Sequence, residues 1–288
     1  MKPLFLLPFL MTACNRGVDC DNPQPQPTDD TTFEVVANPN SSESGFGEFS
    51  QYVDVFGLSI YGEEGVCTEH MLHAAHILAE LLDNDENGEW DDPALFNKLL
   101  EEEVLVPIFA YEGSPAEDEF FHNYRGSGVS AVLWNNEMDP SQPGHWGADA
   151  TIEEIMHTIN HVGHVALYPD AFGLEPDSSR LTEAMDVARG GQWTSFPGSY
   201  PEEAWYHYDD RTCDYECMAI EYIYWAQVSH MGILNDPETC EGIANEWELC
   251  SPALLEEGDV LIHALITDST YALPQLAPDG DYTPSVQE

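Results

Sequence analysis

The chain has 288 residues with 54 acidic and only 7 basic side chains, which give a formal net charge of −47 at pH 7. A polyanion of this strength repels nucleic acids and anionic membrane surfaces, so neither is expected as an electrostatic partner, whereas metal cations are attracted. Hydrophobic residues make up 43% and aromatic residues 11% of the chain, enough to exclude wholesale disorder and to predict a sizeable core.

The first fourteen residues have the pattern of an export signal. A lysine at position 2 precedes a short apolar run over 4–11, and Cys14 follows two small residues. The run is too short to cross a bilayer as a helix. The segment resembles the signal peptides of bacterial lipoproteins, which implies lipidation of Cys14 and anchoring at the outer membrane, in the periplasm or at the cell surface. An ordinary secretory signal cut elsewhere is the alternative.

Residues 15–32 are rich in Pro, Gln and Asp, which predicts an extended, disordered tether. Six cysteines remain after Cys14: Cys20, Cys67, Cys213, Cys217, Cys240 and Cys250. An even number in an exported protein predicts up to three disulfides, and the simplest pairing to expect is Cys240 with Cys250, which closes a short loop. A cysteine metal site is the alternative, although the Cys213 and Cys217 spacing is not that of a zinc knuckle.

Hydrophobic patterning over the rest of the chain predicts both strands and helices. Strands are expected over 33–37, 52–61 and 128–135, and a strand or buried loop over 104–110. Helices are expected over 68–82, 93–103, 152–167, 179–188, 213–230 and 254–267. No repeat or linker divides residues 33–288. We therefore predict a single α+β domain in which a mixed or antiparallel sheet packs with several helices.

The loop over 83–92, between the first two predicted helices, has the composition of a calcium site. Oxygen-bearing side chains alternate along it, and Gly88 permits a sharp turn. The loop resembles those of EF-hand proteins, although Ala94 stands where their closing glutamate falls. The candidate calcium ligands are Asp83, Asp85, Asn87, Glu89, Asp91 and Asp92. We expect structural calcium here, and a solvated acidic turn is the alternative.

The helix predicted over 152–167 carries three histidines on its polar face. His157 and His161 lie one helical turn apart, so both can reach a single ion, and His164 lies on the same face. Imidazole suits zinc and other transition metals. A polar face exposed to solvent is the alternative.

The stretch from His157 to His161 resembles the active helix of zincin metallopeptidases, which carries the motif HExxH. Both histidines are present, but Thr158 stands where the catalytic glutamate belongs. Glu153 or Glu154, one turn upstream, can serve as the general base instead. Glu154 also fits a capping box with Thr151 at the helix start.

The resemblance to gluzincins implies that a glutamate on a later helix completes the zinc site. Glu183 in the next predicted helix occupies roughly that position. Glu221 is a rival, because a carboxylate among many aromatic residues is expected to be buried and to need a partner. His164 is a third candidate. His207, in an aromatic segment beyond these helices, is a candidate for stabilising the oxyanion of a tetrahedral intermediate.

The sequence therefore predicts an exported, lipid-anchored, zinc-dependent hydrolase that acts on peptides or other small extracellular substrates, with calcium bracing the fold. Another transition metal can replace zinc in this hypothesis. The alternative is a non-catalytic surface lipoprotein that binds metal and calcium. No nucleic-acid partner is expected, and contact with a membrane is expected only through Cys14. Arg189 and Arg211 are either structural or bind a carboxylate of the substrate.

Overall fold

The computed structural model describes residues 32–285 and has the α+β fold that the sequence predicts. The predicted signal over 1–14, the proposed lipidation at Cys14 and Cys20 lie outside the described residues. All but the last residue of the predicted tether lies outside them as well.

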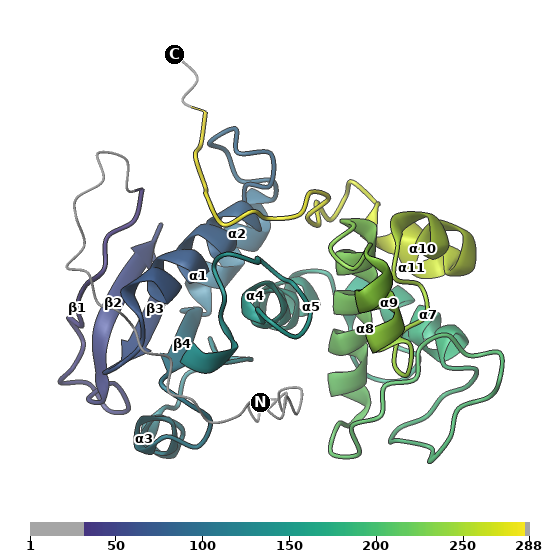
Figure 1. Cartoon of the computed structure of the whole chain (residues 1–288), viewed down its shortest axis with the longest axis horizontal. Coiled ribbons are helices and arrows are strands. Elements are labelled where there is room, and N and C mark those ends of the chain that lie inside the picture. Colours follow the sequence, from purple (N-terminus) through teal and green to yellow (C-terminus); the bar gives the residue numbers. More distant parts are fainter. Residues whose placement is uncertain (1–31, 286–288) are drawn as a thin grey trace.

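A five-stranded sheet forms one side of the described part of the chain, in purple and blue in Figure 1. Its strands lie in chain order: β1 (Val36–Ala37), β2 (Phe49–Val55), β3 (Leu58–Glu63), β4 (Leu105–Phe109) and β5 (Leu133–Trp134). The first three strands pair antiparallel, whereas β3, β4 and β5 pair in parallel, so the sheet is mixed. Helices supply the crossover connections that parallel pairs need.

The strand predicted over 52–61 is a hairpin instead. Val55 pairs with Leu58, and the two residues between them, Phe56 and Gly57, have φ of 57° and 98°. Two positive φ values match the tight turns that follow the twist of paired strands. The strands predicted over 33–37 and 128–135 shorten to β1 and β5, and the segment over 104–110 contains the buried strand β4.

Both faces of the sheet are covered. Helix α1 (Thr68–Glu80) packs against β2 and β3, and α2 (Pro93–Glu101) follows it after the acidic loop; these confirm the first two predicted helices. Helix α3 (Pro115–Asn123), which the sequence analysis did not predict, adds Phe120 to an aromatic cluster with Phe49 and Phe109. The sheet therefore separates the main core from a smaller aromatic core.

The predicted histidine-rich helix is continuous and is seen nearly end-on at the centre of Figure 1. It consists of α4 (Thr151–Thr158), the π-helix η2 (Ile159–His164) and α5 (Val165–Leu167). A π-helical segment of this kind is uncommon and is frequent at functional sites. Its first segment, α4, contacts α1 on the sheet side and α8 on the other side, so this helix joins the two halves of the fold.

The remaining helices gather around α8 (Tyr215–His230), which is buried along nearly its whole length. They are α6 (Pro169–Phe172), α7 (Arg180–Ala188), α9 (Pro237–Ile243), α10 (Pro252–Gly258) and α11 (Val260–Ile266). The helix predicted over 254–267 is broken at Asp259. That residue caps α11 through the Ile262 amide and accepts hydrogen bonds from Trp205 and Tyr222.

After α11 the chain crosses back over the molecule to the acidic loop, as the yellow segment in Figure 1 shows. We call residues 274–285 the C-terminal strap. Asn84 accepts from the amides of Gln275 and Leu276, Glu80 accepts from those of Asp279 and Gly280, and the Tyr282 hydroxyl donates to Asp83. The strap therefore fastens the end of α1 and the acidic loop to the rest of the fold.

Two disulfides link cysteines close in the sequence. Cys240 pairs with Cys250, as predicted, and Cys213 pairs with Cys217 at the start of α8. These pairings exclude a metal site at either pair. Cys67 is disulfide-bonded as well. Among the described residues, no helix is both long enough and apolar enough to cross a membrane.

Candidate metal centre

A group of carboxylates surrounds one buried histidine where α4 meets α8. Glu153, Glu154 and His157 come from α4, and Glu221 comes from α8. We call these four residues the acid–histidine cluster. His157 is 1% exposed, Glu221 3% and Glu154 6%, whereas Glu153 is only half-buried. Glu153 is therefore the one member of the cluster with appreciable exposure.

The two ring nitrogens of His157 face different carboxylates. Nδ1 lies 3.5 Å from Glu154 Oε2, and Nε2 lies 3.5 Å from Glu221 Oε2. One donor atom each from Glu153, His157 and Glu221 lies within 4.8 Å of the other two. Both ring nitrogens and Glu154 Oε2 are buried without a hydrogen-bond partner of good geometry. Buried polar atoms are rarely left in this state, so the cluster has the character of a ligand site.

The predicted capping box is wrong, and its absence frees Glu154 for this cluster. Ala150 is the N-cap residue of α4, and Thr151 instead donates a hydrogen bond from its hydroxyl to Asp149. Helix α4 thus begins one residue earlier than the capping box requires. The carboxylate of Glu154 turns inward to His157, three residues along the helix, as neighbouring side chains on a helix do.

Burial and mutual repulsion control the charges of the cluster. Burial raises the pKa of Glu153 well above its ordinary value, and the charge of Glu221 adds to the effect. Burial also raises the pKa of Glu154. For His157 burial opposes protonation, but the charges of Glu221 and Glu154 outweigh it and raise its pKa well above the ordinary value. A cation among these groups would relieve the repulsion between the carboxylates.

Tyrosines support the carboxylates from the second half of the fold. The Tyr208 hydroxyl donates to Glu221 Oε1 at 3.1 Å. Tyr224 lies one turn after Glu221, and its ring meets that of His157 edge-on with centroids 5.4 Å apart. Burial raises the pKa of the Tyr224 hydroxyl, and the charges of Glu153 and Glu221 add to the effect. Neither tyrosine is among the site residues that the sequence predicts, although Tyr208 directly follows the oxyanion candidate His207. For Tyr224 a signal was available, namely its spacing of three residues from Glu221.

The cluster fits the donor set of a transition-metal site. A metal-bound histidine normally donates its second ring N–H to a carboxylate, as Nδ1 of His157 can to Glu154. Nε2 of His157, Glu221 and Glu153 then supply one nitrogen and two carboxylate ligands. Three protein ligands that leave one position open are the pattern of catalytic zinc sites.

The structure places the other predicted zinc ligands differently. Burial lowers the pKa of His161 to about 4, and the charge of the nearby His157 adds to the effect. The Nδ1 atom of His161 is hydrogen-bonded to Ser130 at 2.8 Å. His164 is buried against Phe172. Glu183 is exposed on α7. Among the described residues, no group of three converging donors includes His161, His164 or Glu183.

His207 lies outside the acid–histidine cluster. Its Nε2 is hydrogen-bonded to the Ala204 carbonyl at 2.7 Å, and its Nδ1 lies 3.9 Å from Glu248. The neighbouring Tyr208 is the residue of this segment that contacts Glu221.

The acidic loop brings together three of the six predicted calcium ligands. Asp83, Asp85 and Asp91 each offer an oxygen within 4.8 Å of the others. Asp83 is fully buried, and it accepts hydrogen bonds from the Asn87 and Gly88 amides and from Tyr282. The Asp83 carboxylate therefore uses much of its hydrogen-bonding capacity to hold the shape of the acidic loop.

The other three predicted calcium ligands have different roles. Asp92 is the N-cap of α2, where it accepts from the Ala94 and Leu95 amides. Asn87 accepts from the Glu89 amide, which closes a local turn. Asp92, Asn87 and Glu89 are not members of the converging group. Sequence spacing alone did not distinguish ligand positions from capping and turn positions.

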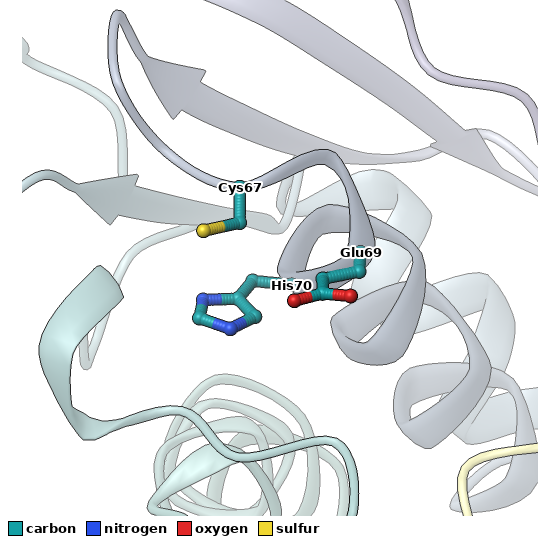
Figure 2. A group of neighbouring side chains, drawn as sticks. All are labelled: Cys67, Glu69 and His70. Carbon is teal, nitrogen blue, oxygen red and sulfur yellow. The ribbon is translucent and has the colours of Figure 1, made fainter. Parts of the chain in front are cut away.

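A third group, Cys67, Glu69 and His70, lies at the start of α1. Figure 2 shows the sulfur and the carboxylate close to the His70 ring, and donor atoms of the three lie within 4.8 Å of one another. Because Cys67 is disulfide-bonded, it offers no thiolate. His70 Nδ1 is also hydrogen-bonded to Asn135 at 2.8 Å. This group is therefore part of the structural core and not a metal site.

Comparison with known protein families, with curated proteins and with solved structures finds no match for this chain.

Proposed function

We propose that the chain binds one transition-metal ion, zinc in the first instance, through His157, Glu221 and Glu153, and that it uses this centre to hydrolyse its substrate. The observation that supports the proposal is the buried imidazole of His157, whose ring nitrogens both face carboxylates and lack a good hydrogen bond. Placing an ion beside Nε2 satisfies the nitrogen and relieves the repulsion between carboxylates.

Each residue of the cluster has a definite role in this proposal. A bound zinc ion would supply Lewis acidity and lower the pKa of water at the open position. Glu154 holds the His157 ring so that Nε2 faces the centre. Tyr208 fixes the orientation of Glu221. Glu153, the half-buried member, lies on the side from which a substrate can approach.

The substrate class rests on the sequence resemblance. The HxxxH motif of His157 and His161 is similar to that of zincin peptidases, which supports a peptide bond as the bond cleaved. Export is supported by the two disulfides, because such bonds persist in oxidising compartments. The lipid anchor at Cys14 rests on the signal pattern alone.

The low exposure of the cluster favours a second candidate, a non-catalytic metal-binding protein. His157 and Glu221 are 1% and 3% exposed, so a substrate can reach the centre only past Glu153 or after a movement of the chain. In this alternative the ion joins α4 to α8 and stabilises the fold.

The convergence of Asp83, Asp85 and Asp91 supports calcium as a further, structural ion. It would lie between α1 and α2, where the strap also binds, and would not take part in the chemistry.

Metal content of purified protein, measured by plasma mass spectrometry after zinc loading and desalting, tests the centre. We expect about one zinc per chain in the wild type and a loss of at least about tenfold in affinity for His157→Ala and Glu221→Gln. The matched control is Glu183→Gln, the ligand that the zincin resemblance implies. It should keep its zinc, because Glu183 is exposed on α7. Unchanged zinc in His157→Ala would refute the site.

Turnover of a fluorogenic peptide library then separates the two candidates. A hydrolase should lose activity on metal removal and regain it with zinc, and Glu153→Gln should lower kcat. Zinc bound at full occupancy without any turnover of peptides or simple esters would leave the non-catalytic candidate.

A further inference from the structure

Arg189 is a buried cation in a chain that has very few. It is the C-cap residue of α7, directly before the long segment 190–214, and its side chain is 0% exposed. The other basic residues with side-chain ion pairs lie at the surface: Lys98 pairs with Glu101 and Glu102, and Arg180 pairs with Asp268. With 54 carboxylates in the sequence, a buried arginine has no shortage of possible partners.

In the part of the chain that the structure describes, the guanidinium of Arg189 nevertheless forms no ion pair with a carboxylate. Its charge acts on the nearby Asp186: burial raises the pKa of Asp186, and Arg189 counteracts this effect. The Nη1 atom of Arg189 contacts the sulfur of Met185 at 4.0 Å. The backbone N–H of Arg189 donates to carbonyls in the last turn of α7. Nε and Nη2 are buried without a hydrogen-bond partner. Among the described residues, no ion pair within 4.0 Å includes Arg189. An uncompensated charge of this kind is costly to bury.

The two free nitrogens form one edge of the guanidinium. Nε–H and one Nη2–H point in the same direction, so they can donate two parallel hydrogen bonds to both oxygens of a carboxylate. The edge that is free in Arg189 is therefore the one suited to bidentate recognition. The Tyr200 ring lies beside it, with its centroid 5.7 Å from Cζ.

A second unpaired group, Glu246, lies close to the same tyrosines. It is 6% exposed, and its Oε2 is buried without a hydrogen-bond partner. The charges of Arg189 and Glu246 act in opposite directions on the pKa of Tyr200 and of Tyr206, which burial raises. Within residues 32–285, Arg189 and Glu246 form no ion pair with each other, so the guanidinium edge and the Glu246 oxygen both stay without a partner.

We propose that the Nε and Nη2 edge of Arg189 binds the carboxylate of a small organic ligand, with the Tyr200 ring packed against that group. The site is separate from the acid–histidine cluster and does not depend on a bound metal. Two tyrosines connect the sites: the Tyr200 ring beside Arg189 donates from its hydroxyl to the Tyr208 carbonyl, and the Tyr208 hydroxyl donates to Glu221.

Access to Arg189 requires the segment 190–214 to move. Trp193 donates from its indole to the Arg189 carbonyl at 3.2 Å, and Tyr200 donates from its hydroxyl to the Tyr208 carbonyl at 2.7 Å. Gly190, with φ of 68°, lies at the start of this segment and permits the sharp change of direction. Apart from two isolated bridges, residues 190–214 contain no helix or strand, as is common for segments that cover binding sites.

The test compares N-acetyl-phenylalanine with its amide, which lacks the charge, by calorimetry and thermal shift in 0.15 M salt. A panel of acetate, N-acetyl-glycine and N-acetyl-phenylalanine covers small and larger acids. We expect the acids to bind and to raise Tm, whereas the amide should do neither. Arg189→Met should weaken binding of the acids by about 10- to 100-fold, since hydrogen bonds to a charged group are lost.

Two further variants protect the test against a folding defect. Arg189→Lys keeps the charge but removes the fork, so it should fold and bind the acids about tenfold or more weakly. Glu246→Gln removes a competing negative charge and should bind them at least as tightly as the wild type. If Arg189 is only structural, Arg189→Met lowers stability and leaves the difference between acid and amide unchanged.

Carboxylates also bind zinc, so the titrations are repeated with EDTA and with His157→Ala. Binding that persists there and is lost in Arg189→Lys supports the site, whether or not the metal proposal holds. Binding that disappears with EDTA and survives in Arg189→Lys assigns the carboxylate to the metal and overturns the site. No response of the wild type to any acid of the panel overturns it as well.

Discussion

Several residues of the described part of the chain have polar atoms buried without partners, and two groups of them carry charged side chains that our proposals use. His157 and Glu154 lack good hydrogen bonds in the acid–histidine cluster, and Arg189 and Glu246 lack them near Tyr200. The other atoms of this kind belong to His164, Asp186, Tyr215, Trp225 and His230. Most buried polar groups of a folded protein find partners, so these exceptions need an explanation. We propose a bound cation as the explanation for the first group and a bound anion for the second.

Tyr208→Phe tests whether the hydrogen bond from Tyr208 to Glu221 strengthens metal binding. The substitution removes the hydroxyl that donates to Glu221 and leaves the ring in place. Loss of such a contact to a ligand typically weakens metal binding by about 10- to 100-fold, which zinc competition against a chelating dye measures. Tyr222→Phe is the matched control, because that hydroxyl donates to Asp259. An equal loss of affinity in both variants would contradict a specific role for Tyr208.

Among the elements, the acidic loop depends on a segment far away in the sequence. The strap supplies amides to Glu80 and Asn84 and a hydroxyl to Asp83, so α1 and the loop hold their shape through contacts about 200 residues apart along the chain. Asp83 is thereby fixed at 0% exposure. Loop, strap and helix therefore form one structural unit, to which an ion would add a further link.

Calcium should stabilise this unit and so the whole fold. At a free concentration one hundred times its Kd, an ion contributes about 2.7 kcal/mol. For a chain of this size that raises Tm by roughly 5–10 °C. Differential scanning calorimetry with calcium or with EDTA measures the shift. The double variant Asp85→Asn/Asp91→Asn should abolish it, and the exposed Glu64→Gln should not. A calcium response that survives in the double variant would place the ion elsewhere.

At the scale of the whole molecule, buried carboxylates make stability depend on pH. Burial raises the pKa of Glu80 to about 7 and that of Glu246 to about 8, from the ordinary 4.5. Both groups hold protons in the folded state that they lose in the unfolded state. Stability from these groups is therefore present at low pH and is lost as pH rises through 7 to 8.

The free energy of unfolding of metal-free protein should fall by at least about 2–3 kcal/mol between pH 6.5 and 8.5, which urea titrations measure. Glu153, Glu154 and His157, whose pKa values are also raised, act in the same direction. This window avoids His161 and His164, whose pKa burial lowers to about 4 and which act in the opposite direction below pH 6.5. Glu246→Gln should remove about 2 kcal/mol of this fall, because its pKa of about 8 lies inside the window, whereas Glu64→Gln should leave the fall intact. A stability that rises over this window would contradict the effect of burial.

The sequence by itself determined the α+β class, most of the helices, the Cys240–Cys250 pairing and the concentration of polar groups on α4. These follow from local signals: hydrophobic periodicity, cysteine spacing and the side chains of one helix face. The hairpin turn at Phe56, the break at Asp259 and the lengths of β1 and β5 were missed. Positive φ values, capping contacts and strand partners decide those features, and a linear pattern does not contain them.

Only the tertiary structure decided which side chains meet. Glu221 and His157 are 64 positions apart, and α8 brings the former to Nε2 of the latter, whereas Glu183 faces solvent on α7. Thr151 is not the N-cap of α4 as expected, because the helix begins one residue earlier and Ala150 takes that position. The sequence specified donor types along each helix. The packing angle and register between helices, which depend on the whole core, specified which donors converge.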